Sequence, residues 1–157
     1  MQPASPASPA SRPSRFWEAF FPRFYRSIRL TEPLLRRWLR DRTIGDTVGV
    51  TVIGRHSGVP RTVLLGLLLV DGCRYVGHPA SGCAWTRNLD AAGTATLTEP
   101  GRPPVDVRAT PLLDGPEREA VIRATFRQHP FPGNVIYWLA RRHIRAVGRF
   151  YRLESIE

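Results

Sequence analysis

The sequence predicts an α+β fold: a small β-barrel of about six mostly antiparallel strands, with amphipathic helices before it and a helical insertion late in the chain. Short β-branched stretches follow one another through tight turns, which is typical of strands joined by hairpins. No helical segment separates the first three of these stretches, so the long crossover that a parallel sheet requires is absent. The longer helical patterns lie instead before residue 45 and after residue 114.

The composition is that of one globular domain with a strong positive charge. The chain has 157 residues, of which 42% are hydrophobic, so it is long enough to bury one core. All 23 basic residues are arginine, which, with abundant alanine, glycine and proline, is typical of a GC-rich genome such as that of an actinobacterium. The net charge of +10 favours an anionic partner such as a phosphorylated cofactor or a membrane surface. We expect no nucleic-acid binding, because the arginines are evenly spread and no recognition module is visible.

The sequence indicates neither a metal centre nor a disulfide framework. Cys73 and Cys83 are expected to be free thiols. The loop histidines His78 and His129 have no partners at the spacing of metal ligands. No apolar run approaches the roughly 18 residues of a membrane span, and the N-terminus lacks the pattern of a secretory signal. A cytoplasmic location is therefore expected.

The chain divides into three predicted regions. Residues 1–15 repeat proline, alanine and serine, and we expect a disordered tail because this composition cannot offset the entropy of ordering. Residues 16–44 form an amphipathic helical segment. Residues 45–157 form the barrel domain that would bind a cofactor.

Two short amphipathic helices are predicted within residues 16–40, the second beginning near Thr31, because Pro22 and Pro33 interrupt the pattern. Their aromatic residues could enter an anionic membrane surface while arginines meet lipid phosphates, which would make the protein peripheral to the membrane. The alternatives are a helix packed over the barrel and a dimer interface. The residues in question are Phe16, Trp17, Phe20, Phe21, Phe24, Arg23, Arg26 and Arg29.

Glycine and proline signals set the remaining boundaries. Asp71-Gly72 is a two-residue hairpin signal, and Gly93 is suited to ending a helix. Strands are expected at residues 47–53, 61–70, 73–77, 94–99, 104–112 and 147–153, and helices at 83–92, 114–128 and from 134 onward.

The turn after the first strand, Gly54–Arg61, has the sequence GRHSGVPR. Its two glycines let the backbone approach a ligand or adopt positive φ, and its backbone amides could form a concavity suited to phosphate. The alternative is a solvated hairpin turn with incidental arginines. The side chains that could face an anion are those of Arg55, His56, Ser57 and Arg61.

This turn resembles the G-R-K-[ST]-G-x-P-R segment of the deazaflavin-dependent nitroreductase family, which is related to the flavin-binding split barrels. Downstream, Trp85-Thr86-Arg87-Asn88-Leu89 is similar to that family's Trp-x-x-Asn-Leu helix start. The two motifs occur in the family's order, and the resemblance covers about residues 45–153. It implies a split β-barrel that binds coenzyme F420, with FMN as the alternative cofactor.

The resemblance also implies roles for individual residues. Arg55, Ser57 and Arg61 would face the phosphate and the tail of F420, with Gly58 beside them, while His56 stands where the family usually has lysine. Backbone groups of the loop would run beside the deazaflavin ring, and two residues of the following helix would border the pocket. Those loop and helix residues are Ala80, Ser81, Gly82, Trp85 and Asn88.

The function implied is that of an oxidoreductase that passes a hydride from reduced F420 to a small organic acceptor, such as a quinone, an activated double bond or a nitro compound. Tyr137, on the late helix, is the candidate proton donor, although core packing is the other use of such a residue. The alternative function is non-catalytic binding of another flavin, haem, a tetrapyrrole or a fatty acid. The chain would act as a monomer or a homodimer.

Overall fold

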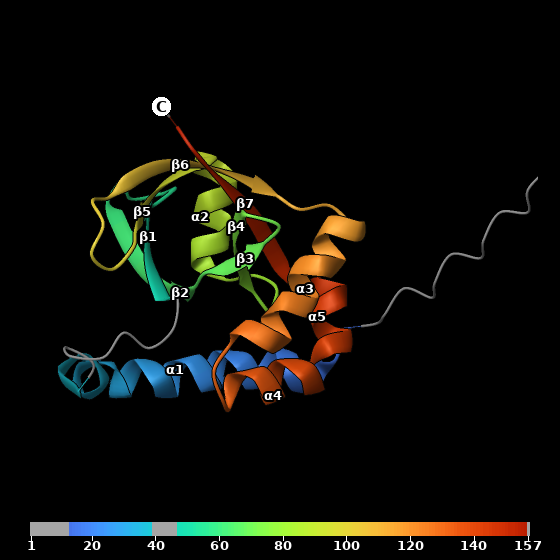
Figure 1. The fold of residues 1–157 in the computed structure, drawn as a ribbon. Coiled ribbons are helices and arrows are strands. Elements are labelled where there is room, and N and C mark those ends of the chain that lie inside the picture. The colour runs from blue at the N-terminus through green and yellow to red at the C-terminus, as the bar shows by residue number, and fades with distance from the viewer. Residues whose placement is uncertain (1–12, 39–46, 157) are drawn as a thin grey trace, which may run out of the picture.

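The computed structural model describes residues 13–38 and 47–156. Most of the predicted tail and the end of the predicted helical segment, residues 1–12 and 39–44, lie outside the described residues. Within these ranges the chain forms one seven-stranded antiparallel sheet, which curls into a half-barrel, and five helices (Figure 1). The α+β barrel expected from the sequence is therefore confirmed.

The seven strands lie in the order β2-β1-β5-β6-β7-β4-β3. They are β1 Thr47–Ile53, β2 Pro60–Gly66, β3 Leu68–Val70, β4 Cys73–His78, β5 Thr94–Thr98, β6 Val105–Pro111 and β7 Arg149–Ser155. The helices are α1 Arg15–Trp38, α2 Ala84–Ala92, α3 Pro116–Gln128, α4 Gly133–Leu139 and α5 Arg141–Val147.

The seventh strand arises because the strand expected at residues 61–70 is divided at Leu67. Before Leu67 the chain pairs with β1, and after it the chain pairs with β4 at the other edge of the sheet. Leu67 itself is buried in the barrel core, so the corner shows the same apolar character as the strands on either side. An uninterrupted apolar run carries no turn signal, which is why the sequence predicted one strand.

Two cores hold the fold together. The first fills the curl of the sheet, where Val50, Leu97 and Tyr151 pack against Trp85 and Leu89 of α2. The second lies between the outer face of the sheet and the layer formed by the other four helices (Figure 1). Its most deeply buried members are Phe21, Val121, Ile122, Ala140 and Ile144.

The N-terminal region contains one continuous helix, α1, and the prediction of two short helices was wrong. Pro22 and Pro33 both lie inside it, although a proline in a helix interior costs one backbone hydrogen bond. Tertiary contacts around Pro22 offset this cost, because Phe21 is completely buried and its ring stacks with that of Tyr137 at 6.1 Å. Of the three roles considered for this segment, namely membrane contact, packing over the barrel and a dimer interface, Phe21 has the second.

The late helix expected from residue 134 is also different, because it is broken into α4 and α5 at Ala140. Ala140 is fully buried in the second core. The small side chain allows the two short helices to meet closely there, and nothing in the local sequence marks the break.

None of the helices in residues 13–38 and 47–156 is long and apolar enough to cross a membrane. Cys73 and Cys83 are both free, as expected.

The buried guanidinium of Arg118 on α3 caps the C-terminal end of α5. Its Nη2 donates to the carbonyl oxygens of Ile144, Arg145 and Gly148 at 3.4, 3.1 and 2.9 Å, and its Nη1 lies 3.1 Å from Asp114 Oδ1. The carbonyl of Ile144 also accepts from the backbone N–H of Gly148 at 2.8 Å. The last carbonyls of a helix commonly lack a partner within it, so the side chain of Arg118 supplies a charged donor to this end of the helix.

We expect Arg118→Met to lower the free energy of unfolding by about 3 kcal/mol, because three carbonyls lose a charged donor. Urea denaturation followed by circular dichroism measures this loss. The control is Arg123→Met on the same helix, at an exposed position, which should cost about 0.5 kcal/mol or less. Equal losses in the two variants would contradict the assigned role of Arg118.

Candidate functional site

The turn Gly54–Arg61 between β1 and β2 is closed by its own backbone. The N–H of Gly54 donates to the carbonyl oxygen of Val59 at 3.0 Å, and the N–H of Gly58 donates to that of Gly54 at 2.8 Å. Gly58 has φ +65°, the left-handed conformation that glycine adopts without strain. Ser57 Oγ accepts from the N–H of Val59 at 3.3 Å. The turn is therefore an ordered loop built on its two glycines.

Two side chains of the turn converge over Gly54. A Cβ atom on this residue would lie only 2.6 Å from Ser57 Oγ and 3.9 Å from Arg61 Nε. Gly54 is buried, whereas Ser57 and Arg61 are exposed. The absence of a side chain at Gly54 thus lets a hydroxyl and a guanidinium come together on the solvent side of the turn.

Asn88 of α2 holds the turn in place. Its Oδ1 accepts from the backbone N–H of Arg55 at 3.3 Å and from Arg55 Nη1 at 3.0 Å. Asn88 is buried within the first turns of α2, which places its carboxamide directly behind the loop. The two motifs that were singled out in the sequence are therefore in direct contact, and the carboxamide oxygen of Asn88 faces Arg55.

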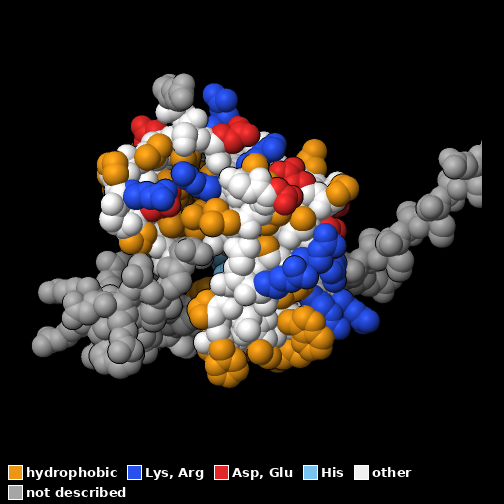
Figure 2. Space-filling model, viewed as in Figure 1, with side chains coloured by type: hydrophobic (Ala, Val, Ile, Leu, Met, Phe, Trp, Pro, Cys, Tyr) orange, Lys and Arg blue, Asp and Glu red, His pale blue; other side chains and the backbone are white. Residues whose placement is uncertain are grey.

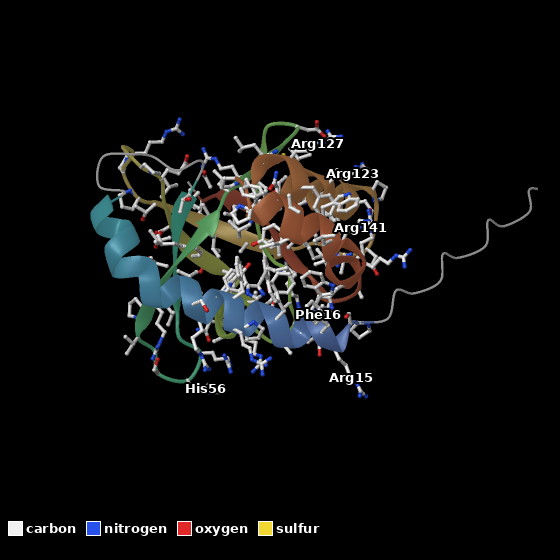
Figure 3. The ribbon with its side chains drawn as sticks, turned by 90° about the horizontal axis from the view of Figure 1, so that it is seen from below. Arg15, Phe16, His56, Arg123, Arg127 and Arg141 are labelled. Atoms are coloured by element: carbon white, nitrogen blue, oxygen red, sulfur yellow. The ribbon has the colours of Figure 1, made fainter. Side chains whose placement is uncertain are left out.

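The outer side of the turn consists of donors. Arg55, His56, Ser57, Gly58 and Arg61 are all exposed, and Figure 3 shows His56 at the tip of the loop, away from the barrel. Among the side chains of residues 13–27 and 47–156, no carboxylate forms an ion pair with either arginine of the turn. Guanidinium, hydroxyl and imidazole donors on a glycine turn fit the phosphate of a nucleotide-like cofactor.

The predicted ring loop, Ala80–Gly82, lies under α1. Ala80 is buried and its N–H donates to His78 Nδ1 at 3.2 Å, while Gly82 has φ +75°. Ser81 Oγ donates to Glu18 Oε1 of α1 at 3.3 Å. The helix therefore contacts this loop at Ser81, which, like Gly82, remains exposed. Neither motif indicated this contact. Trp85, in contrast, packs in the barrel core with its ring 6.0 Å from that of Tyr151.

Tyr137 belongs to a second cluster of polar aromatic side chains, beside the ring loop. Its hydroxyl is 2.6 Å from that of Tyr25 on α1. The ring of His78 lies 5.2 Å from that of Tyr25, and the ring of His129 lies 4.7 Å from that of Tyr137. His78, His129 and Tyr137 line a small cavity that admits about one water molecule. Of this cluster the sequence predicted only Tyr137 as a site residue. Tyr25 was missed because α1 is brought next to Tyr137 only in the tertiary structure.

Burial sets the protonation of this cluster. It raises the pKa of the Tyr137 hydroxyl, although the bond to Tyr25 acts in the other direction, and it raises the pKa of Tyr25 well above its usual value. Burial lowers the pKa values of His78 and His129, each partly offset by a hydrogen bond to backbone. Near pH 7 the cluster therefore contains two neutral phenols and two neutral imidazoles. Among the described residues, no group of histidine, cysteine and carboxylate side chains could hold a metal ion.

Neither a protein-family model nor a curated protein sequence matches the chain. Solved structures do match it. The F420-H2 dependent reductase FDR-A has a TM-score of 0.52 and 22% identity, over 69% of this chain and 94% of that one. The haem storage protein HutZ from Vibrio cholerae has a TM-score of 0.53 and 14% identity, over 80% and 90% of the two chains.

A protein of unknown function from Agrobacterium tumefaciens has a TM-score of 0.53 and 18% identity over 71% of this chain. The match spans 48% of that protein, so about half its length. A further neighbour, with a TM-score of 0.51 and 21% identity over 85% of this chain, is a domain-swapped dimer. These identities establish the fold alone. The chain has the fold of the flavin-binding split barrels, and the predicted resemblance is confirmed at that level.

We expect Asn88→Ala to lower the free energy of unfolding by about 1–2 kcal/mol, because Arg55 loses the acceptor of two hydrogen bonds. Chemical denaturation measures the change. Ala91→Gln, at an exposed position of the same helix, is the control and should be nearly neutral. An Asn88→Ala protein as stable as the wild type would contradict the role of Asn88 in holding the turn.

Acidification should destabilise the protein through His78 and His129. Their pKa values are lowered in the folded chain, so the unfolded chain binds protons first as the pH falls through the ordinary histidine value of 6.5. The free energy of unfolding should therefore be greatest above that pH and decrease as the pH falls from 6.5 toward the lowered pKa values of the folded chain. His129→Gln should make the decrease smaller in urea titrations at several pH values. A pH dependence identical to that of the wild type would contradict this assignment.

Proposed function

We propose that the chain is an oxidoreductase that uses reduced coenzyme F420 to reduce a small organic acceptor. The observation that carries this proposal is the contact between Asn88 and Arg55, which joins the two motifs of the deazaflavin-dependent family at one exposed turn. The likeness of the fold to FDR-A is compatible with it. When bound, reduced F420 would supply the hydride.

The turn Gly54–Arg61 would hold the phosphate end of this cofactor. Arg61 and Ser57 converge over Gly54, so a guanidinium and a hydroxyl are directed to one place on the solvent side. Arg55 would add a third donor group, oriented by Asn88, and the guanidinium has further N–H groups beyond the one that Asn88 accepts. His56 would add a further hydrogen-bonding group at the tip of the loop.

The ring loop and the tyrosine pair would form the reacting end. The backbone of Ala80–Gly82 would run beside the ring, and Glu18 of α1 would hold this loop through its hydrogen bond with Ser81. Tyr137 would then donate a proton to the reduced acceptor, since its hydroxyl is protonated near pH 7 and is hydrogen-bonded to that of Tyr25. Tyr25 would orient Tyr137 for this step.

The second candidate function is non-catalytic binding of haem. Two observations favour haem over the other non-catalytic ligands. HutZ, a haem storage protein, is among the similar structures. The imidazoles of His78 and His129 are both kept neutral by burial. The cavity that they line beside Tyr137 admits about one water molecule, so haem would require this region to open. Neutral imidazole is the form that binds haem iron.

Titration of the purified protein with F420, FMN and haemin separates the two candidates. We expect F420 to bind at micromolar concentration, followed by its fluorescence, and Arg61→Ala to weaken binding roughly tenfold or more through the loss of a charged phosphate contact. Arg123→Ala, exposed and on α3, is the matched control and should bind as the wild type does. Tight binding of haemin with no binding of F420 would replace the first proposal by the second.

Tyr137→Phe should lower turnover with F420 and a nitro or quinone acceptor by roughly a hundredfold, because a positioned general acid contributes about that much. The affinity for F420, measured in parallel, should not change. Tyr25→Phe should have a smaller effect, since it removes only the orienting hydroxyl. Full turnover in Tyr137→Phe would remove this residue from the mechanism.

A further inference from the structure

Large apolar side chains gather on the outward face of α4. Val135, Trp138 and Leu139 are 43%, 50% and 52% exposed, and their spacing of three and four residues places them on one side of the helix. Phe131, in the loop before α4, is 80% exposed. These four residues are called the α4 patch below. Solitary exposed apolar residues are ordinary on protein surfaces, but a contiguous group of this kind marks an interaction surface.

The packing of α4 fixes which residues face outward. Tyr137, on the opposite side of the helix, is buried against Tyr25, and Ala140 at its end is fully buried. Rotation of α4 to hide the α4 patch would therefore expose the second core. The α4 patch is a fixed feature of the folded chain.

Arginines lie beside the α4 patch. From residue 120 to residue 153 the sequence contains seven arginines and neither aspartate nor glutamate. Three of these arginines form ion pairs with carboxylates from other parts of the sequence, namely Arg145 with Glu119, Arg149 with Asp90 and Arg152 with Glu117. Among the described side chains, the other four arginines form no ion pair. The Arg141 guanidinium lies 4.3 Å from the centre of the Trp138 ring, and its Nη1 donates to the carbonyl oxygen of Trp138 at 2.9 Å. Arg123, Arg127 and Arg142 are exposed.

The figures show these two kinds of side chain next to each other. In Figure 2, hydrophobic side chains gather along the lower edge of the molecule over α4, with arginines directly beside them. In Figure 3, seen from that lower side, Arg123, Arg127 and Arg141 lie along the same side of the helical layer. The surface thus combines an apolar centre with a cationic margin.

We propose that the α4 patch docks the protein on an anionic lipid bilayer. Tryptophan, phenylalanine and leucine would enter the boundary between headgroups and acyl chains, while the neighbouring guanidinium groups would contact lipid phosphates. Arg141 is suited to this arrangement, because its guanidinium lies over the Trp138 ring and so places a positive charge directly beside the tryptophan that would enter the boundary. An anionic bilayer therefore offers an apolar region for the exposed aromatic and aliphatic side chains and phosphates for the arginines beside them.

A second copy of the chain is a poorer occupant of the same surface. A symmetric contact through the α4 patch would bring the exposed arginines Arg123, Arg127 and Arg142 of one copy toward the same arginines of the other. The surface is also separate from the contact predicted for residues 16–40, in which Phe21 is already used in the core and Phe16 is 65% exposed.

Vesicle sedimentation with the full chain tests this proposal. We expect the protein to sediment with vesicles of equal parts phosphatidylcholine and phosphatidylglycerol, and to remain in solution with phosphatidylcholine alone. Phe131→Ser combined with Trp138→Ser should reduce partitioning about tenfold or more. The control pair is Ile53→Ser with Leu113→Ser, at positions 49% and 84% exposed elsewhere on the molecule, which should partition as the wild type does. Circular dichroism checks that each variant is folded.

A second readout does not depend on removing apolar area. Brominated phosphatidylcholine in the anionic vesicles should quench the tryptophan fluorescence of the wild type, and Trp138→Phe should abolish most of this quenching while the protein still binds. The proposal is overturned if the wild type does not bind anionic vesicles or if the double variant binds as tightly as the wild type. It is also overturned if Phe16→Ser removes binding in its place, or if the double variant converts a dimer into a monomer in size-exclusion chromatography.

Discussion

The carboxamide oxygen of Asn88 accepts hydrogen bonds from the backbone and the guanidinium of Arg55, and the arrangement of the candidate site depends on this contact. α2 fills the curl of the sheet, so Asn88 is as firmly placed as the barrel core itself. The turn Gly54–Arg61 takes its position from α2, and its exposed donors are thereby presented to solvent in one arrangement. A donor set oriented before a ligand arrives loses less entropy when an anion binds.

The second core connects the N-terminal helix to the reacting end of the proposed site. Phe21 is buried among residues of α3, α4 and α5, and this burial places Tyr25 against Tyr137 and Glu18 against Ser81. One helix therefore contacts the ring loop and completes the tyrosine pair. The aromatic residues of this helix, which the sequence indicated as possible membrane contacts, include Phe21, and Phe21 is fully buried in the second core.

The features that the sequence predicted well are those decided by nearby residues. Asp71 and Gly72 have φ values of +50° and +77°, as a two-residue hairpin requires, and Gly93 ends α2 with φ +66°. The corner at Leu67 and the break at Ala140 are decided by distant packing partners, so no local signal marks them. Tyr25 was missed for the same reason, since its partner Tyr137 lies 112 residues away in the chain.

We propose that Gly54–Arg61 is a phosphate-binding turn, which Asn88 holds in place. The most direct measurement is the affinity of the wild-type protein for F420, compared with that for the same deazaflavin lacking the phosphate and the glutamate tail. Both titrations use fluorescence at low and at high salt. We expect F420 to bind at least about tenfold more tightly than the truncated deazaflavin, and we expect high salt to reduce this preference. Equal affinity for the two compounds at low salt would contradict a phosphate-binding role of the turn.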